Sequence, residues 1–164
     1  MITLEPWAED DLDLLRRANA PELMVHLGGP ETDEQIVARH QRYLTGDTFT
    51  GQVYSIRLQP GGERVGTIGY WDKEWLGDKV WETGWTVLPA YQRRGIAVAA
   101  TLAVIEVARA AGRFRYLHAF PSVENVGSNG VCRKAGFTLL GEHDFEYPKG
   151  HFMRCNDWRY ELFD

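Results

Sequence analysis

Cysteine is scarce in this sequence, which has only Cys132 and Cys155 in 164 residues. Two cysteines are too few for the disulfide framework of a small secreted domain. No paired spacing of cysteine and histidine is typical of a zinc site. We therefore expect two free thiols and no metal site.

Long apolar segments and an excess of positive charge are also missing. No uninterrupted apolar run is long enough to span a bilayer, and the chain starts without the basic and apolar regions of a signal peptide. The net charge of −5 argues against a nucleic-acid surface, because such surfaces concentrate positive charge. We therefore expect a cytoplasmic protein that binds neither membranes nor nucleic acids.

The order of local patterns predicts a mixed α/β domain over residues 1–164. A short helix is expected after the acidic residues 9–11, and Thr32 with Gln35 forms a capping box that opens a second helix. Further helices are expected at 96–111 and 128–135. Strands are expected at the following segments: 53–58, 65–71, 79–88, 116–120, 137–147 and 152–162. The first three of these strands form an antiparallel unit, and the fourth is parallel to its predecessor if the helix between them is a crossover.

The most informative segment is residues 92–97, which lie between a predicted strand and a long apolar helix. Backbone N–H groups at a helix start are unpaired and lie at the positive end of the helix dipole, so they can hold a phosphate. Gly95 allows close approach of the backbone, while Arg93 and Arg94 add charge and forked donors. The segment therefore predicts a diphosphate site, with a simple helix-capping loop as the alternative.

The same segment resembles the acetyl-CoA signature of the GNAT superfamily of acyltransferases. In that signature Gln92, Gly95 and Ala97 stand at the specified positions. Its expected second half follows as Asn125, Ser128 and the run at 134–137 (Lys-Ala-Gly-Phe). The Asn-x-x-Ser pattern is most similar to the branch that acetylates ribosomal proteins and other N-terminal amines, although antibiotic- and polyamine-modifying relatives share these residues.

The resemblance implies an α+β fold, with a V-splayed, mostly antiparallel sheet of about seven strands flanked by about four helices. Acetyl-CoA would then lie where two parallel strands separate. The strand edge at Trp85 and Val87 would bond the pantetheine amides. The diphosphate would be wrapped by Arg93, Arg94, Gly95, Ile96, Ala97 and Val98. Asn125 would lie near the pantetheine, and capping the next helix is its equally weighted alternative.

Acetyl transfer to a primary amine needs a base, a polarised carbonyl and a proton for the leaving thiolate. The resemblance places Glu82 as the general base, against the alternative of a solvated or structural carboxylate. The Val87 N–H is a candidate oxyanion donor, and Ser128 is the first candidate near the leaving sulfur. Cys132 stands where many relatives carry a tyrosine acid, and a buried cysteine is more often inert packing.

The acceptor is expected between residues 25–30 and 142–150. Carboxylates there could attract a cation (Glu142, Asp144 and Glu146), and three polar side chains could line the site (His26, His143 and Tyr147). Four tryptophans are further candidates, with packing as their more frequent role (Trp71, Trp75, Trp81 and Trp85). Exposed strand edges make a homodimer plausible.

Other classes of protein fit the sequence less well. A phosphate-binding kinase or NTPase would need Gly-Lys-Ser/Thr after the glycine loop, which is absent. A cysteine hydrolase using Cys132 with His118 or His143 has no local support. A non-catalytic acyl-CoA sensor of the same fold stays open, because the tyrosine acid is missing.

Overall fold

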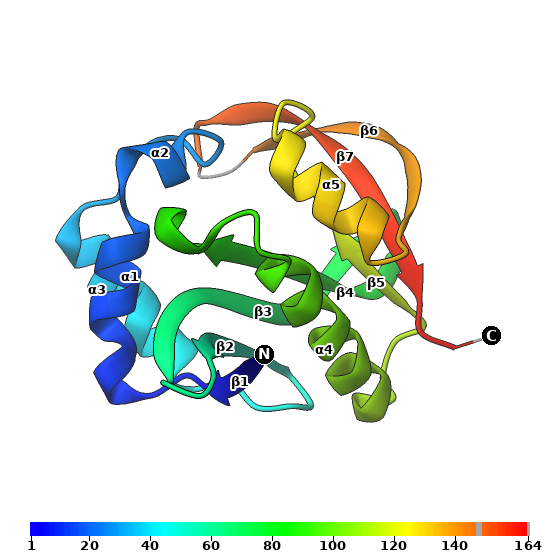
Figure 1. The fold of residues 1–164 in the computed structure, drawn as a ribbon. Helices are drawn as coiled ribbons and strands as arrows, with labels where there is room; N and C mark the ends of the chain where they lie inside the picture. The colour runs from blue at the N-terminus through cyan, green and yellow to red at the C-terminus, as the bar shows by residue number, and fades with distance from the viewer. Residues whose placement is uncertain (147–148, 164) are drawn as a thin grey trace.

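The computed structural model describes residues 1–146 and 149–163, and its seven strands form one sheet (Figure 1). The strand order is β1-β2-β3-β4-β5-β7-β6. All neighbouring pairs are antiparallel except β4 and β5, which run parallel. The strands are β1 (Ile2–Pro6), β2 (Gly51–Leu58), β3 (Glu63–Trp75), β4 (Asp78–Val87), β5 (Tyr116–Ala119), β6 (Thr138–Glu146) and β7 (Phe152–Glu161). The expected mixed, mostly antiparallel α+β architecture is confirmed.

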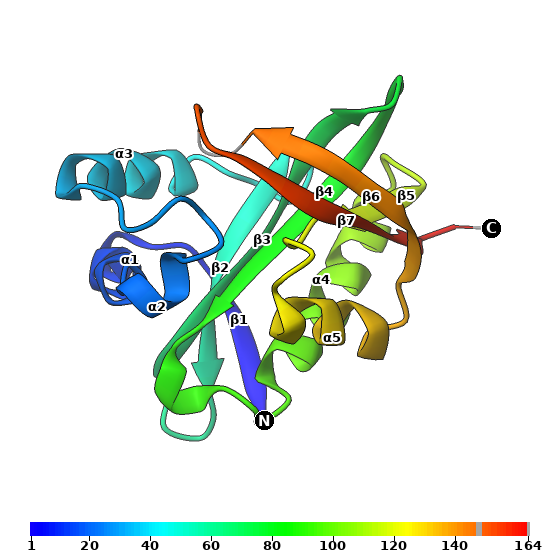
Figure 2. The same cartoon turned by 90° about the horizontal axis from the view of Figure 1, so that it is seen from above.

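Helices cover both faces of the sheet (Figure 2). One face carries α1 (Leu12–Ala18), α2 (Pro21–Met24) and α3 (Asp33–Tyr43), and the other carries α4 (Ile96–Ala111) and α5 (Val126–Lys134). The two groups of helices pack on separate apolar clusters, of which the one beneath α4 and α5 is the larger. Within the described residues, no helix is long and apolar enough to cross a membrane.

The long hairpin of β3 and β4 depends on its two-residue turn. Leu76 and Gly77, which separate the paired residues Trp75 and Asp78, have φ angles of 51° and 88°. A turn with two positive φ values matches the right-handed twist of the flanking strands. The hairpin thereby holds β3 beside the whole length of β4.

Two elements were not expected from the sequence. β1 adds a fourth strand before the glycine loop and pairs with β2 from Ile2 opposite Leu58 to Pro6 opposite Tyr54. A four-residue helix, α2, precedes the segment 25–30. Both are short, and β1 offers too few alternating residues for a distinct period-two signal.

β4 and β5 touch only briefly before they separate. Their parallel pairing consists of Trp81 opposite Leu117 and Glu82 opposite His118, while β4 continues to Val87. α4 crosses between the two strands, with Ala100 and Val104 fully buried in the larger cluster. The sheet is therefore splayed along the last five residues of β4.

Candidate functional site

Beyond Glu82, β5 has separated from β4, so one edge of β4 has no strand partner there. We call the space between the two separated strands the opening. The Leu88 N–H donates to the Val65 carbonyl at 2.9 Å, so Leu88 and Val65 stand at a hydrogen-bonded position of the hairpin. Hydrogen-bonded and non-bonded pairs alternate along an antiparallel ladder. Trp85 and Val87 stand at the non-bonded positions opposite Ile68 and Gly66, so their backbone groups point away from β3. They point into the opening, as expected of an edge that bonds an extended ligand.

The start of α4 lies next to this edge and leaves its N–H groups free of a side-chain cap. Gly95 is the N-cap residue, with φ 77° and ψ 8°, and it provides no side-chain hydrogen bond. A Cβ added to Gly95 would meet no atom within 4 Å, so space is open above the helix end. An uncapped helix start with open space fits a diphosphate.

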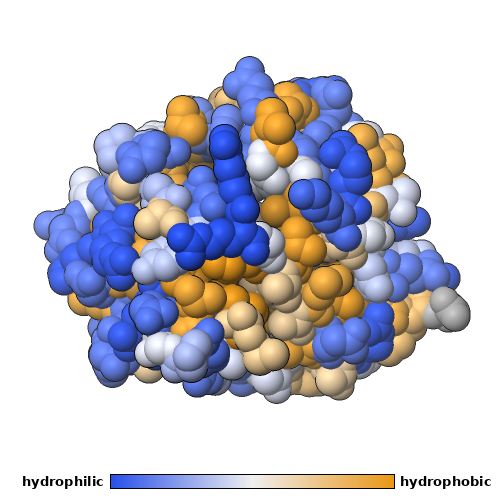
Figure 3. All heavy atoms as spheres, viewed as in Figure 1, coloured by the Kyte–Doolittle hydropathy of each residue, from blue (hydrophilic) through white to orange (hydrophobic). Residues whose placement is uncertain are grey.

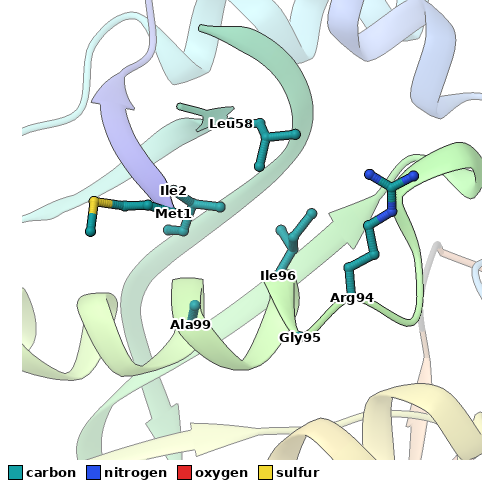
Figure 4. A pocket seen from close by; sticks show the side chains of 7 residues that line it. All are labelled: Met1, Ile2, Leu58, Arg94, Gly95, Ile96 and Ala99. Carbon is teal, nitrogen blue, oxygen red and sulfur yellow. The ribbon is translucent and has the colours of Figure 1, made fainter. Parts of the chain in front are cut away.

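Apolar side chains line a shallow pocket beside the same helix start (Figure 4). It has a volume of about 150 Å³ and lies between the start of α4 and the residues Ile2 and Leu58. Arg94 stands at its edge. Figure 3 shows apolar atoms gathered over β1 and the start of α4, with hydrophilic atoms around them. The pocket is smaller than a site for a whole ligand of CoA size, so it is at most a part of one.

The residues before Gly95 attach the loop to the sheet. Gln92 donates its side-chain amide to the Val87 carbonyl at 3.0 Å. The Arg94 guanidinium lies 5.4 Å from the ring centre of Tyr91, while Arg93 is exposed and has a φ of 64°. Gln92 therefore holds the loop against β4 and occupies one backbone group of the edge, and the two arginines border the helix start.

The second half of the sequence motif forms the start of α5. The Asn125 side chain accepts a hydrogen bond from the Ser128 N–H at 3.0 Å, which is the capping role weighed for it. Ser128 is half-buried in the first turn. α4 and α5 lie side by side on one face of the sheet (Figure 1). A role for Ser128 in protonating the leaving sulfur stays a prediction.

Asn129 is the buried centre of this region, and motif reasoning missed it. Its amide donates to the carbonyls of Ser122 (2.9 Å) and Asn125 (2.8 Å). Its oxygen accepts from Asn156 at 2.8 Å and from the Trp158 indole at 2.7 Å. One side chain thus joins α5 to the loop after β5 and to β7. In the sequence, only its position next to the motif residue Ser128 pointed to Asn129.

We expect Asn129→Ala to lower the free energy of unfolding by roughly 2–4 kcal/mol, because several buried partners lose their hydrogen bonds together. Urea denaturation measures this. Asn156→Ala, which removes a single contact to the same oxygen, should cost clearly less. Equal losses in the two variants would show that Asn129 is not the centre of the network.

Cys132 is packed in the larger apolar cluster with no exposed surface. Burial raises the pKa of its thiol to about 12. Burial also raises the pKa of Cys155, to about 11. A thiol in this setting is neutral at pH 7 and inert. Neither the hydrolase pairing with His118 nor that with His143 is formed, since His118 is bonded to Asp157 and His143 stands opposite Cys155 on β7.

We expect a thiol reagent such as dithionitrobenzoate to modify both cysteines of the native protein at least about 100-fold more slowly than after unfolding, because buried neutral thiols are poor nucleophiles. Absorbance of the released thiolate follows the reaction. Rapid modification of Cys132 in native conditions would instead indicate an accessible, activated thiol.

Glu82 lies at the point where β4 and β5 separate, with 22% of its side chain exposed. Burial raises the pKa of the Glu82 carboxyl, and Lys73, Trp71 and His118 oppose that shift. The Trp71 indole donates to Oε1 at 3.1 Å, and the Lys73 ammonium lies 3.8 Å from the same oxygen. A carboxylate with a raised pKa beside an opening has the properties of a general base. Trp71 and Lys73 also give the carboxylate structural partners, so the role of Glu82 as the base stays a prediction.

A buried His118–Asp157 pair lies on the same face as Glu82. Nδ1 of His118 is 2.6 Å from Asp157 Oδ1, and the Trp75 indole donates to the other carboxylate oxygen at 3.1 Å. The bond to His118 keeps the pKa of Asp157 low despite burial. His118 stands opposite Glu82. No role for Asp157 could be predicted from the sequence, because β5 and β7 meet only in the folded sheet.

The expected acceptor side contains fewer free charges than its sequence suggests. Glu142 and Asp144 accept hydrogen bonds from Arg154 at 3.2 and 3.1 Å, and Glu146 accepts one from the Gly150 N–H. Two of the three expected cation-attracting carboxylates are therefore paired with an arginine. Tyr147 lies outside the described residues.

The four tryptophans divide between site and core. Trp71 borders Glu82 and a pocket of about 200 Å³ that also involves Tyr43 and Gln52. Trp75 packs against Phe120, Phe145 and His143. Trp81 is fully buried in the larger cluster, and Trp85 is half-buried and packs against that cluster. In the described part of the chain, no group of three histidine, cysteine or acidic side chains is placed to hold a metal.

Known proteins share both the sequence pattern and the fold. The sequence profile of the acetyltransferase (GNAT) domain matches residues 1–138. The comparison with curated proteins found no match. Three solved structures each cover 98% of it. An aminoglycoside acetyltransferase AAC(6')-Ib in complex with coenzyme A is 17% identical (TM-score 0.78, 95% of its own chain). A ribosomal L7/L12 α-N-protein acetyltransferase in complex with coenzyme A is 19% identical (0.79, 93%). The spermidine N-acetyltransferase from Vibrio cholerae, in complex with CoA and spermine, is 13% identical (0.79, 95%).

Proposed function

The chain belongs to the GNAT acetyltransferase family, and we propose that it transfers the acetyl group of acetyl-CoA to a primary amine. The single observation that carries this proposal is the position of the Glu82 carboxylate, which is partly exposed where β4 and β5 separate and whose pKa is raised by burial. It combines a proton acceptor with an open strand edge that suits an extended donor. Acetyl-CoA would supply an activated acetyl group as its thioester.

The residues around the opening fit such a donor. The free N–H groups of Ile96, Ala97 and Val98 at the start of α4 would bind the diphosphate, with Arg93 and Arg94 beside them. The β4 edge at Trp85 and Val87 would bond the pantetheine amides. This set agrees with the uncapped Gly95 and with its open space.

Residues of this chain can be assigned to the steps of the transfer. Glu82 takes a proton from the bound ammonium, so that the amine can attack as a neutral nucleophile. The Val87 N–H is directed into the opening and would stabilise negative charge on the carbonyl oxygen. Ser128 or a water would give the proton to the leaving thiolate. Cys132 is excluded as this acid by its complete burial.

A non-catalytic acyl-CoA sensor is the second candidate, favoured by the cysteine at the usual tyrosine position. Release of CoA thiol, measured across peptides, polyamines, aminoglycosides and amino acids, separates the two. Turnover with any primary amine, at a rate well above hydrolysis, supports the enzyme. Tight acetyl-CoA binding without turnover across the whole panel supports the sensor.

We propose one acetyltransferase domain over residues 1–164, because β6 and β7 beyond the matched segment belong to the same sheet. Membership of the branch that acetylates ribosomal proteins and N-terminal amines stays a prediction, since the named relatives act on an aminoglycoside, a ribosomal protein and a polyamine. A cytoplasmic location and a homodimer also stay predictions.

A further inference from the structure

Lys73 holds its ammonium group beside the proposed base. The side chain extends from β3, and its Nζ lies 3.8 Å from Oε1 of Glu82. Only 26% of the side chain is exposed. A surface lysine is normally mobile and hydrated, whereas this one is held at the position where a bound acceptor would have to present its amine.

Three aromatic rings enclose the same ammonium. Nζ lies 5.1 Å from the ring centre of Phe145, 5.6 Å from that of Phe120 and 5.8 Å from that of Trp75. The rings come from β6, from the residue after β5 and from β3, and Trp75 packs against both phenylalanines. Such rings attract a cation through their electron-rich faces. The enclosure therefore restricts Lys73 to a small volume next to Glu82.

The Lys73 ammonium lies between the hairpin turn and the point where β4 and β5 separate. Lys73 stands opposite Val80 on β4, before the point where β4 and β5 part. Phe120 directly follows β5 and lies beyond His118, the last residue of β5 that pairs with β4. Nζ lies at similar distances from the Phe120 ring and from the Trp75 ring next to the hairpin turn, so its place at the point of separation is set by the 3.8 Å distance to Glu82.

We propose that Lys73 is an internal acetyl acceptor, so that the protein acetylates its own Lys73 from acetyl-CoA. This inference rests on the proposed function. Glu82 takes a proton from Nζ, the freed lone pair forms a bond to the acetyl carbonyl carbon, and the carbon–sulfur bond breaks. CoA leaves as a thiolate that gains a proton. The product is Nε-acetyl-Lys73, which is uncharged, so the cation beside Glu82 is removed.

Labelling can be followed at every lysine, because the chain has only four: Lys73, Lys79, Lys134 and Lys149. The purified protein is incubated with deuterium-labelled acetyl-CoA, and peptide mass spectrometry follows each lysine. We expect Lys73 to be labelled at least about 100-fold faster than the exposed Lys79, because a positioned amine reacts as if highly concentrated. The first-order rate should not change when the protein is diluted.

A second readout uses a free acetylating ester without acetyl-CoA. That reagent should label exposed Lys79 faster than enclosed Lys73, so the order of the two lysines reverses between the two donors. Glu82→Gln should slow the labelling of Lys73 by acetyl-CoA by about 100-fold and leave ester labelling of Lys79 unchanged. Lys79→Arg is the matched control and should leave labelling of Lys73 intact.

Two results would overturn self-acetylation. One is labelling of Lys73 by acetyl-CoA no faster than that of Lys79, and the other is a rate that rises in proportion to protein concentration. If external amines are still acetylated in that case, Lys73 is only an ion partner of Glu82 and the proposed function stands. If acetyl-CoA does not bind at all in calorimetry, both the self-acetylation and the proposed function are wrong.

Discussion

Replacing Gly95 with glutamate is expected to weaken acetyl-CoA binding by at least about 100-fold, which corresponds to about 2.7 kcal/mol. Gly95 has a φ of 77°, and a residue with a Cβ is strained by about 1–2 kcal/mol in that conformation. The new carboxylate would lie at the positive end of α4 and compete with a phosphate for the same N–H groups. Its Cβ meets no atom within 4 Å, so no clash disturbs the fold. Isothermal calorimetry with acetyl-CoA measures the change.

Gly112 offers a matched control at the other end of the same helix. It is the C-cap residue of α4, with a φ of 69°, and a Cβ added there also meets open space. Gly112→Glu therefore brings the same strain and charge, but at the negative end of the helix dipole. It should lower stability and leave acetyl-CoA affinity unchanged. Equal losses of affinity in both variants, or none in Gly95→Glu, would contradict a diphosphate site at the start of α4.

Elements with strong local signals could be predicted from the sequence. Thr32 and Gln35 form the reciprocal hydrogen bonds of a capping box, at 3.2 and 2.9 Å, and α3 begins there. α4 covers 96–111 and ends at Gly112, as its apolar pattern and the glycine predicted. Asn125 caps α5. In each case the structure depends on residues a few positions apart, which is the range that a sequence pattern describes.

Groups assembled from distant segments could not be predicted in this way. The His118–Asp157 pair joins residues 39 positions apart, and the rings around Lys73 come from three segments. β1 is stabilised by its pairing with β2, since five residues carry little periodicity of their own. Glu82 was found only because a family resemblance pointed to its strand, while its neighbours Lys73 and Trp71 are known from the folded hairpin. The chemistry of this site is therefore set by tertiary contacts.

Glu82→Gln is expected to lower kcat/KM for acetyl transfer to an amine by about 10²–10⁴-fold, the contribution of a positioned general base. The amide has the shape of the carboxylate and can still accept the hydrogen bond from the Trp71 indole, so the fold should persist. The rate of CoA thiol release, measured with an accepted amine, gives the value. Glu74→Gln is the matched control, because Glu74 is an exposed carboxylate on the same hairpin, and it should leave kcat/KM unchanged.

The pH dependence distinguishes a base from a residue that only shapes the site. Burial raises the pKa of Glu82 above the ordinary value of 4.5, so the wild-type kcat/KM should fall as the pH drops through that raised pKa and the base becomes protonated. Ionisation of the acceptor amine adds its own fall, which remains in the variant. The pH profile of Glu82→Gln should therefore lack the part of the fall in kcat/KM at low pH that comes from protonation of the carboxylate. If the variant is slow but its kcat/KM falls at low pH as in the wild type, the proton acceptor lies elsewhere. His118 is then the residue to test by substitution, because it stands opposite Glu82 and is bonded to Asp157.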